Sequence, residues 1–202
     1  MTISLHTADG LVLEGEWSAP TRARATAVLC HPHPQYGGTM RSIVTSALFE
    51  ALPEHGIACL RFNFRGVENS QGEHSKGMDE PLDVVAALDA AASRSDNRPL
   101  VLVGWSFGAD MAFAVDDARV AAWVGIAPPL RFRAHVISDD PRAKFLVLAA
   151  HDEFRAPADV EAEVAGWVNT HVAVVPGASH FFVGRTKNVV DLVVDFVGSS
   201  VG

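Results

Sequence analysis

One serine in this chain of 202 residues stands in a pattern suited to nucleophilic chemistry. Residues 104–108 read Gly-Trp-Ser-Phe-Gly and directly follow the apolar run 100–103. A G-x-S-x-G turn between a strand and a helix strains the backbone at its serine and exposes the hydroxyl beyond the strand. Glycines flank the serine because side chains there would collide with neighbouring backbone. The pattern predicts Ser106 as a nucleophile, against the alternative of a glycine-rich turn with an incidental serine.

A serine hydroxyl needs a base, and the base needs an acid that orients it. Among nine histidines, His180 is the best placed, because it lies in the loop that follows the apolar run 171–175. The alternative for His180 is an ordinary surface histidine. In this arrangement the acid lies between the serine and the histidine along the chain. Asp152, which follows the run 145–149, is the first candidate, and Glu153 is the alternative.

Acyl transfer also requires backbone donors that bind the developing oxyanion. The amide of Phe107, next to the nucleophile, is expected to be one of them. The second is expected from residues 31–38, HPHPQYGG, in which the prolines carry no N–H. We expect the amide of His33 to be this donor, with Gln35, Tyr36 and the glycines as alternatives.

Three further features of the sequence have simple explanations. His31 and His33 have the H-x-H spacing of a metal site, but a metal would leave the serine motif unexplained, so none is expected. Cys30 and Cys59 lie in apolar runs and are expected to be buried, reduced thiols. Asp110 is expected to complement the N-terminus of the helix after the nucleophile.

Strands and helices are expected to alternate along the chain. Strands are expected at 1–7, 11–17, 26–30, 57–64, 100–103, 120–126, 144–149 and 171–175, and helices at 41–54, 79–92, 107–115, 157–169 and 184–197. Asp-Gly at 9–10 predicts a hairpin between the first two strands. The alternation predicts one α/β domain over residues 1–202, with a mostly parallel sheet covered on both faces. In such sheets the functional groups lie beyond the carboxyl ends of the strands.

Composition excludes several classes of partner. Hydrophobic residues make up 49% of the chain and the formal net charge is −8. An acidic chain without a basic run is not expected to bind nucleic acid or an anionic membrane. The N-terminus lacks the pattern of a signal peptide, and no apolar run is long enough to cross a bilayer. We therefore expect a cytoplasmic protein, either a monomer or a homodimer.

On these residues the chain resembles the α/β-hydrolase superfamily, and most of all its small, cap-less serine hydrolases of the dienelactone-hydrolase-like and short-chain-esterase-like kind. The stretches that match are 31–40 (HPHPQYGGTM), 61–66 (RFNFRG), 104–110 (GWSFGAD), 150–153 (AHDE) and 177–182 (GASHFF). The resemblance implies an eight-stranded sheet with helices on both faces and hydrolysis through an acyl-serine intermediate without a dissociable cofactor. Relatives often carry Gly-x-x-Asp before the acid, whereas this chain has Ala-Ala-His-Asp.

The expected function is therefore hydrolysis of carboxylic esters of small or short-chain acyl substrates. About fifteen residues separate positions 127 and 144, which leaves no room for a lid domain. An open site suits small soluble esters better than long-chain lipids. The alternatives are a thioesterase, a peptidase or a perhydrolase on the same triad, a metal-dependent hydrolase, or a non-catalytic binding protein that kept the fold.

The shape of the pocket depends on several loops, so its lining residues are only candidates. Tyr36, Trp105 and Phe181 are expected to line the substrate pocket, and Phe107 and Phe182 are further aromatic candidates that fit the core equally well. The connection after residue 127 also carries Arg131, Phe132 and Arg133. These three either rim the site or are simply solvated loop residues.

Overall fold

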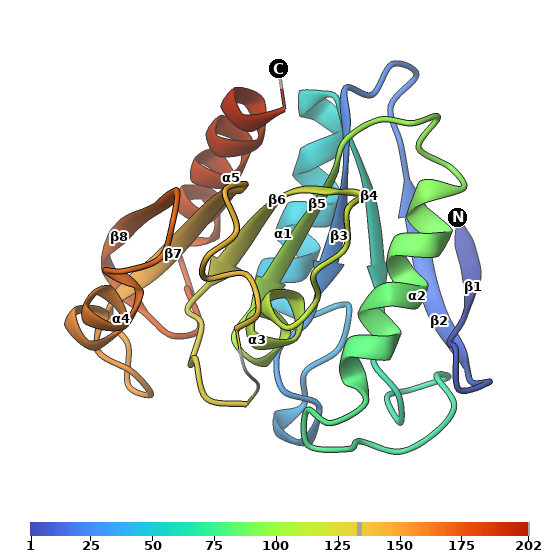
Figure 1. Ribbon diagram of the computed structural model, residues 1–202, viewed down its shortest axis with the longest axis horizontal. Coiled ribbons are helices and arrows are strands. Elements are labelled where there is room, and N and C mark those ends of the chain that lie inside the picture. The colour runs from blue at the N-terminus through green and yellow to red at the C-terminus, as the bar shows by residue number, and fades with distance from the viewer. Residues whose placement is uncertain (133–134, 202) are drawn as a thin grey trace.

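The computed structural model describes residues 1–132 and 135–201 and contains one eight-stranded sheet in the order β1-β2-β4-β3-β5-β6-β7-β8 (Figure 1). The strands are β1 (Thr2–His6), β2 (Val12–Ser18), β3 (Ala25–Cys30), β4 (Ile57–Phe62), β5 (Leu100–Trp105), β6 (Val120–Ile126), β7 (Ala143–His151) and β8 (Thr170–Ser179). β2 pairs antiparallel with both β1 and β4, and all other neighbours are parallel. The expected mostly parallel sheet is confirmed.

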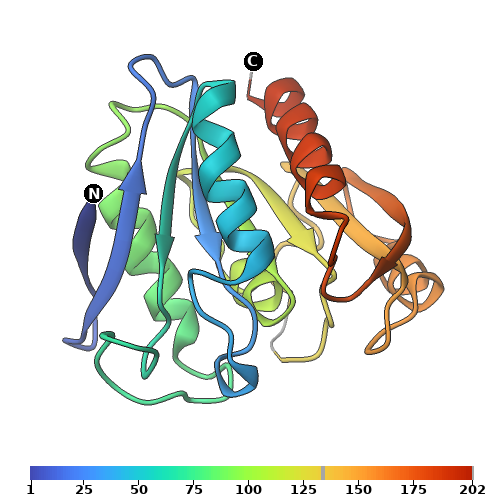
Figure 2. The ribbon, with the colours of Figure 1, turned by 180° about the vertical axis from the view of Figure 1, so that it is seen from behind.

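Helices cover both faces of this sheet. They are α1 (Ile43–Ala51), α2 (Glu80–Ala92), α3 (Phe107–Phe113), α4 (Pro157–Val164) and α5 (Thr186–Ser200), together with the short 3-10 helices η1 (Pro34–Tyr36) and η2 (Leu52–His55). Figure 1 shows α2, α3 and α4 in front of the sheet, and Figure 2 shows α1 and α5 on the opposite face. Among the described residues, no helix is both long and apolar enough to cross a membrane.

The sheet separates two apolar cores. Every residue of β3 and of β5 is buried, as expected for central strands with helices on both sides. Because successive side chains of a strand point to opposite faces, Leu102 packs in the core beneath α2 and α3, whereas Val101 and Val103 pack in the core beneath α1 and α5. This burial fixes the register of the strands whose ends carry the site.

Three helices are shorter by two residues or more than the sequence pattern indicates, and one of them, α3, ends at Phe113 rather than at 115. α1 begins at Ile43 rather than at 41 and ends at Ala51, followed by η2, which contains Pro53. Proline has no N–H for the helical ladder, so the α-helix gives way to a tighter turn there. α4 ends at Val164 instead of extending to 169, just before Gly166, a residue type that disfavours helix.

The topology brings functional loops to one edge of the sheet. From β3 the chain moves to β4 on one side and then returns to β5 on the other. Loops after β3 and β5 therefore diverge at a switch point, where α/β sheets commonly place their ligands. The loops after β7 and β8 reach the same edge, because these strands run parallel to β5.

Candidate active site

Ser106 occupies the strained turn that the sequence predicts between β5 and α3. Its backbone has φ 53° and ψ −122°, and α3 begins at the next residue. A Cβ on Gly104 would lie 2.3 Å from the carbonyl oxygen of Gly108, and a Cβ on Gly108 would lie 2.3 Å from that of Cys30. Such distances exclude any side chain, so both glycines are required for the close packing of this turn.

Three side chains from separate loops form a hydrogen-bonded chain. His180 Nε2 lies 2.9 Å from Ser106 Oγ, and His180 Nδ1 lies 2.8 Å from Asp152 Oδ2. An ionised carboxylate only accepts hydrogen bonds, so Nδ1 carries the proton and Nε2 is free to accept the serine proton. The imidazole is nearly buried, with 5% of His180 exposed. The structure thus brings together the three residues that the sequence singles out.

The surroundings of Asp152 keep its carboxyl ionised. Burial alone would raise its pKa, but hydrogen bonds from His180 and from the amides of Phe154 and Arg155 outweigh burial, and the net pKa lies below its usual value. An ionised Asp152 can stabilise the imidazolium that forms when His180 accepts a proton. Ala149 stands where relatives often carry a glycine, but it does not prevent the hydrogen bond between Asp152 and His180.

Two residues hold the backbone of His180 through contacts that the sequence does not predict. Glu153, considered from the sequence as an alternative acid, accepts a hydrogen bond from the backbone amide of His180 at 3.0 Å. Trp105, considered as a pocket residue, lines the pocket but is only 4% exposed. Its indole Nε1 donates to the carbonyl oxygen of His180 at 3.3 Å. Both contacts fix the backbone that carries the base.

Two backbone amides at the site are available to an oxyanion. Phe107 is the first residue of α3, and an amide at that position has no partner within its helix. Among the described residues, neither the amide of Phe107 nor that of His33 donates to a backbone carbonyl outside the helices and strands or to a side chain. The other amides considered for the second donor are engaged. The amide of Gln35 donates to His33 Nδ1, and the amides of Tyr36 and Gly38 donate to the His33 carbonyl oxygen. The amide of Gly37 donates to the Pro34 carbonyl oxygen. The assignment of His33 as the second donor therefore stays a prediction, and it is supported by the absence of a partner for this amide among the described residues.

His31 faces the core and is not arranged as a metal ligand. Its Nε2 accepts a hydrogen bond from the amide of Phe64 at 3.1 Å, and its Nδ1 lies 2.6 Å from the carbonyl oxygen of Pro32. Burial lowers the pKa of His31 to about 3, so the ring is neutral at pH 7. Both ring nitrogens therefore form hydrogen bonds with backbone groups. Cys30 and Cys59 are free and buried, as expected.

A pocket of about 580 Å³ opens beside Ser106 and His180. Its lining is mainly apolar and aromatic and includes Tyr36, Ile43, Trp105, Phe132, Phe154 and Phe181. Tyr36 is 85% exposed and therefore forms the rim rather than the floor. Phe107 and Phe182 are fully buried and belong to the core. Ile43 and Phe154 are additions to the set expected from the sequence.

Asp110 lies in the first turn of α3, as expected, and it also holds the connection between β6 and β7. Its carboxylate is fully buried and accepts hydrogen bonds from three consecutive amides, those of Leu130, Arg131 and Phe132, at 2.8–2.9 Å. These contacts with the β6–β7 connection come in addition to the expected place of Asp110 in the first turn of its helix. Arg131 and Phe132 line the pocket. Arg133 lies outside the described residues.

Comparisons with known proteins point to one family and one fold. The family described as serine aminopeptidase, S33, matches residues 21–174. An uncharacterized protein of Rickettsia prowazekii is 29% identical over 199 residues, covering 92% of this chain and 84% of the relative.

Two solved structures are similar over almost the whole chain. An α/β serine hydrolase homologue from Coxiella burnetii is 32% identical with a TM-score of 0.86, covering 96% of each chain. A serine hydrolase without a lid from Xanthomonas campestris is 26% identical with a TM-score of 0.86, covering 95% of this chain and 90% of that one. The resemblance to cap-less α/β-hydrolases is confirmed.

Proposed function

Because the chain belongs to the serine aminopeptidase S33 family of α/β-hydrolases, we propose that it is a serine hydrolase that cleaves carboxylic esters of small or short-chain acyl substrates. The observation that carries the proposal is the hydrogen-bonded chain from Ser106 through His180 to Asp152, in which Ser106 and His180 line an open, mainly apolar pocket. A protein that only binds ligands has no need for this complete arrangement.

The geometry supports an acyl-serine mechanism. Ser106 Oγ attacks the ester carbonyl carbon while its proton passes to His180 Nε2. Asp152 stabilises the imidazolium, and the amides of Phe107 and His33 bind the oxyanion. When the tetrahedral intermediate collapses, the C–O bond to the alcohol breaks and the imidazolium returns the proton to the leaving alcohol. A water then attacks the acyl-serine with His180 again acting as base, which releases the acid and restores Ser106.

The dimensions of the site favour small substrates. The volume of about 580 Å³ lies within the range usual for small-molecule pockets. The connection between β6 and β7 is too short to hold a lid domain. A long acyl chain would therefore remain partly in water, and its burial would add little to the binding energy.

The family description also raises a second candidate function, that of an aminopeptidase. An aminopeptidase must hold the α-ammonium group of its substrate, for which a carboxylate in the pocket is the suitable partner. Among the described residues that line the pocket there is neither an aspartate nor a glutamate, and Arg131 carries a positive charge. This electrostatic environment disfavours an ammonium group and supports ester over aminopeptide substrates.

The proposal is tested with p-nitrophenyl esters from acetate to octanoate, an acetyl thioester and alanine p-nitroanilide, each with the wild-type protein and a Ser106→Ala variant. We expect hydrolysis of the short esters and a loss in kcat of roughly 10⁶-fold in the variant, as in other triad deletions. Undiminished hydrolysis by Ser106→Ala would refute the assignment of the nucleophile. Faster turnover of the anilide than of any ester would instead identify an aminopeptidase.

A further inference from the structure

The loop that presents the His33 amide is held at both ends by two consecutive residues that follow β4. This loop, residues 31–42, is called the oxyanion loop below. At its start, His31 Nε2 accepts the amide hydrogen of Phe64 at 3.1 Å. Near its end, the amide of Met40 donates to Asn63 Oδ1 at 2.8 Å. The same turn of backbone therefore fixes the loop on both sides of His33.

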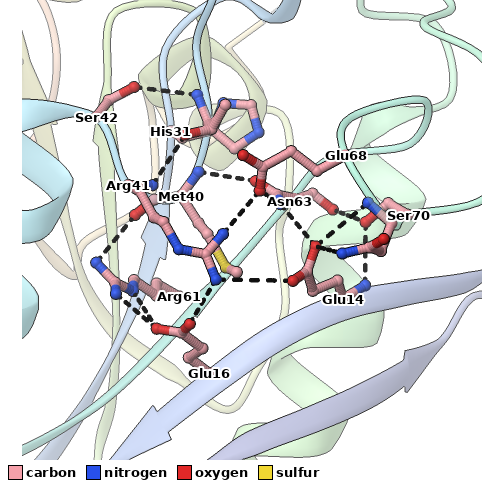
Figure 3. A network of polar contacts seen from close by, with 12 residues as sticks. Glu14, Glu16, His31, Met40, Arg41, Ser42, Arg61, Asn63, Glu68 and Ser70 are labelled. Atoms are coloured by element: carbon pink, nitrogen blue, oxygen red, sulfur yellow. Dashed lines mark hydrogen bonds and ion pairs between the residues drawn. The ribbon is translucent and has the colours of Figure 1, made fainter.

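The carboxamide of Asn63 is held in one orientation. Its Nδ2 donates to Glu14 Oε2 at 3.0 Å and to Glu68 Oε2 at 2.7 Å, and Asn63 is completely buried (Figure 3). Carboxylates only accept hydrogen bonds, so the amide nitrogen must face the two glutamates and the oxygen must face Met40. Asn63 has no other orientation in which all of these groups keep a partner.

Arg41, the neighbour of Met40, ties the loop to the same carboxylates. Its guanidinium lies 2.7 Å from Glu16 Oε1 and 2.7 Å from Glu68 Oε2 (Figure 3). Glu68 thus contacts both Asn63 and Arg41. Buried and partly buried hydrogen bonds that share partners restrain one another, so the end of the oxyanion loop is fixed as a unit.

A displacement at Met40 would reach His33, because the part of the loop between them is tightly packed. The His33 carbonyl oxygen accepts the amides of both Tyr36 and Gly38 at 3.1 Å. A Cβ on Gly38 would lie only 2.2 Å from the carbonyl oxygen of Pro32. The backbone of residues 32–38 is therefore packed too closely for a shift at Met40 to leave His33 in place.

We infer that Asn63 is a positioning residue for the oxyanion hole, acting through the oxyanion loop on the amide of His33. The inference rests on the proposed function, since it concerns the donor to the acyl-transfer intermediate. One oxyanion donor contributes about 10²–10³-fold to kcat in serine hydrolases. A shift of about 1 Å in a positioned group can remove much of this effect.

The inference is tested by comparing Asn63→Ala with Ser70→Ala. Ser70 Oγ donates to the Asn63 carbonyl oxygen and accepts from the Glu14 amide, but among the described residues it has no hydrogen bond to the oxyanion loop. It is therefore a matched control for the loss of a buried polar group beside the same network. For each variant we would measure kcat and KM on p-nitrophenyl acetate and the Ki of a trifluoromethyl ketone, whose serine adduct carries an oxyanion.

We expect Asn63→Ala to lower kcat about 10–100-fold, with KM within about threefold of wild type, and to raise the Ki of the ketone by the same factor as the loss in kcat. Ser70→Ala should lower the Tm while kcat and Ki stay within about twofold of wild type. Equal losses of kcat in both variants, or a lower Tm with unchanged kcat and Ki in Asn63→Ala, would overturn the inference and leave Asn63 a purely structural residue.

A second variant keeps the test decisive if Asn63→Ala does not fold. Arg41 has 46% of its side chain exposed, so Arg41→Gln should fold. We expect it to lower kcat several-fold and to raise the Ki of the ketone in parallel. Unchanged values of both would refute the role of Asn63 and Arg41 in holding the oxyanion loop. A wild-type protein that hydrolyses no ester and does not react with the ketone would refute the proposed function itself, which is a separate outcome.

Discussion

Replacing Asp110 with asparagine tests how the pocket wall is held to the nucleophile helix. Asp110 Oδ1 accepts the amide of Leu130, and Oδ2 accepts those of Arg131 and Phe132. An asparagine of the same shape has one acceptor oxygen. If that oxygen takes the place of Oδ2, two amides keep an acceptor, but the asparagine NH₂ group then faces the amide of Leu130.

The size of the effect follows from these three bonds. A hydrogen bond to a charged acceptor contributes about 1.5–3 kcal/mol, and a bond between neutral groups about 0.5–1.5 kcal/mol. Losing one charge-assisted bond and weakening two gives a gross loss of about 3.5–6 kcal/mol. Burial raises the pKa of Asp110 even though the three amides lower it, so the buried negative charge is itself unfavourable. Removing this charge therefore offsets part of the lost hydrogen-bond stability. We expect the free energy of unfolding to fall by about 2–4 kcal/mol.

Urea unfolding at pH 7 measures this change, with Asp89→Asn as the control. Asp89 pairs with Arg119 on the surface and is 60% exposed, so its loss should change the free energy of unfolding by less than about 0.5 kcal/mol. Asp110→Asn should also raise KM for p-nitrophenyl esters, because Arg131 and Phe132 line the pocket. A destabilisation below about 1 kcal/mol with unchanged KM would show that the three amides do not depend on the carboxylate.

Three further predictions concern the turn at Ser106, the acid Asp152 and the two thiols. Gly108→Ala should lower the free energy of unfolding by more than about 3 kcal/mol, because the added Cβ would collide with backbone atoms. Gly166→Ala is the control and should change the free energy of unfolding by less than about 1 kcal/mol, because an added Cβ there meets no atom within 4 Å. Equal urea midpoints for the two variants would contradict this prediction. The folded-state pKa of Asp152 is depressed, so its contribution to stability is present above the ordinary value of 3.8 and is lost as the pH falls through the folded value. Urea unfolding between pH 6 and pH 2 should therefore show a steeper loss on acidification for the wild type than for Asp152→Asn, and parallel curves would argue against the depressed pKa. Burial raises the pKa of both Cys30 and Cys59. A thiol reagent at pH 8 should therefore modify neither cysteine in the native protein and both cysteines in urea. Rapid modification of either cysteine in the native protein would contradict their burial.

Local patterns in the sequence were sufficient to predict the turn at Ser106 and the alternation of strands and helices. The nucleophile, its flanking glycines and the following helix are contiguous, so their geometry follows from local backbone constraints alone. His180 and Asp152 were also identifiable, because the ends of parallel strands meet at one edge of the sheet. Helix ends were less predictable: α1 and α4 stop early at a proline or near a glycine within an otherwise helical pattern.

Roles that depend on distant partners could not be read from the sequence. Glu153 reaches the amide of His180, and Trp105 reaches its carbonyl oxygen 75 positions away. Asp110 is recognisable in the sequence as an acid in the first turn of a helix, but its contacts with the β6–β7 connection depend on residues 20 or more positions away. Asn63 gave a signal only as part of the RFNFRG stretch, and its contact with Met40 across 23 positions emerges only from the packing of the oxyanion loop beside β4.

Covalent labelling tests the central claim most directly. A fluorophosphonate reacts with a serine only when a base and an oxyanion hole activate it. The purified wild type and Ser106→Ala would be treated with the probe, and the modified peptide would be located by mass spectrometry. We predict labelling of the wild type at Ser106 alone and none in the variant. A folded wild type that stays unlabelled, or labelling that persists at another residue in the variant, would contradict an activated Ser106.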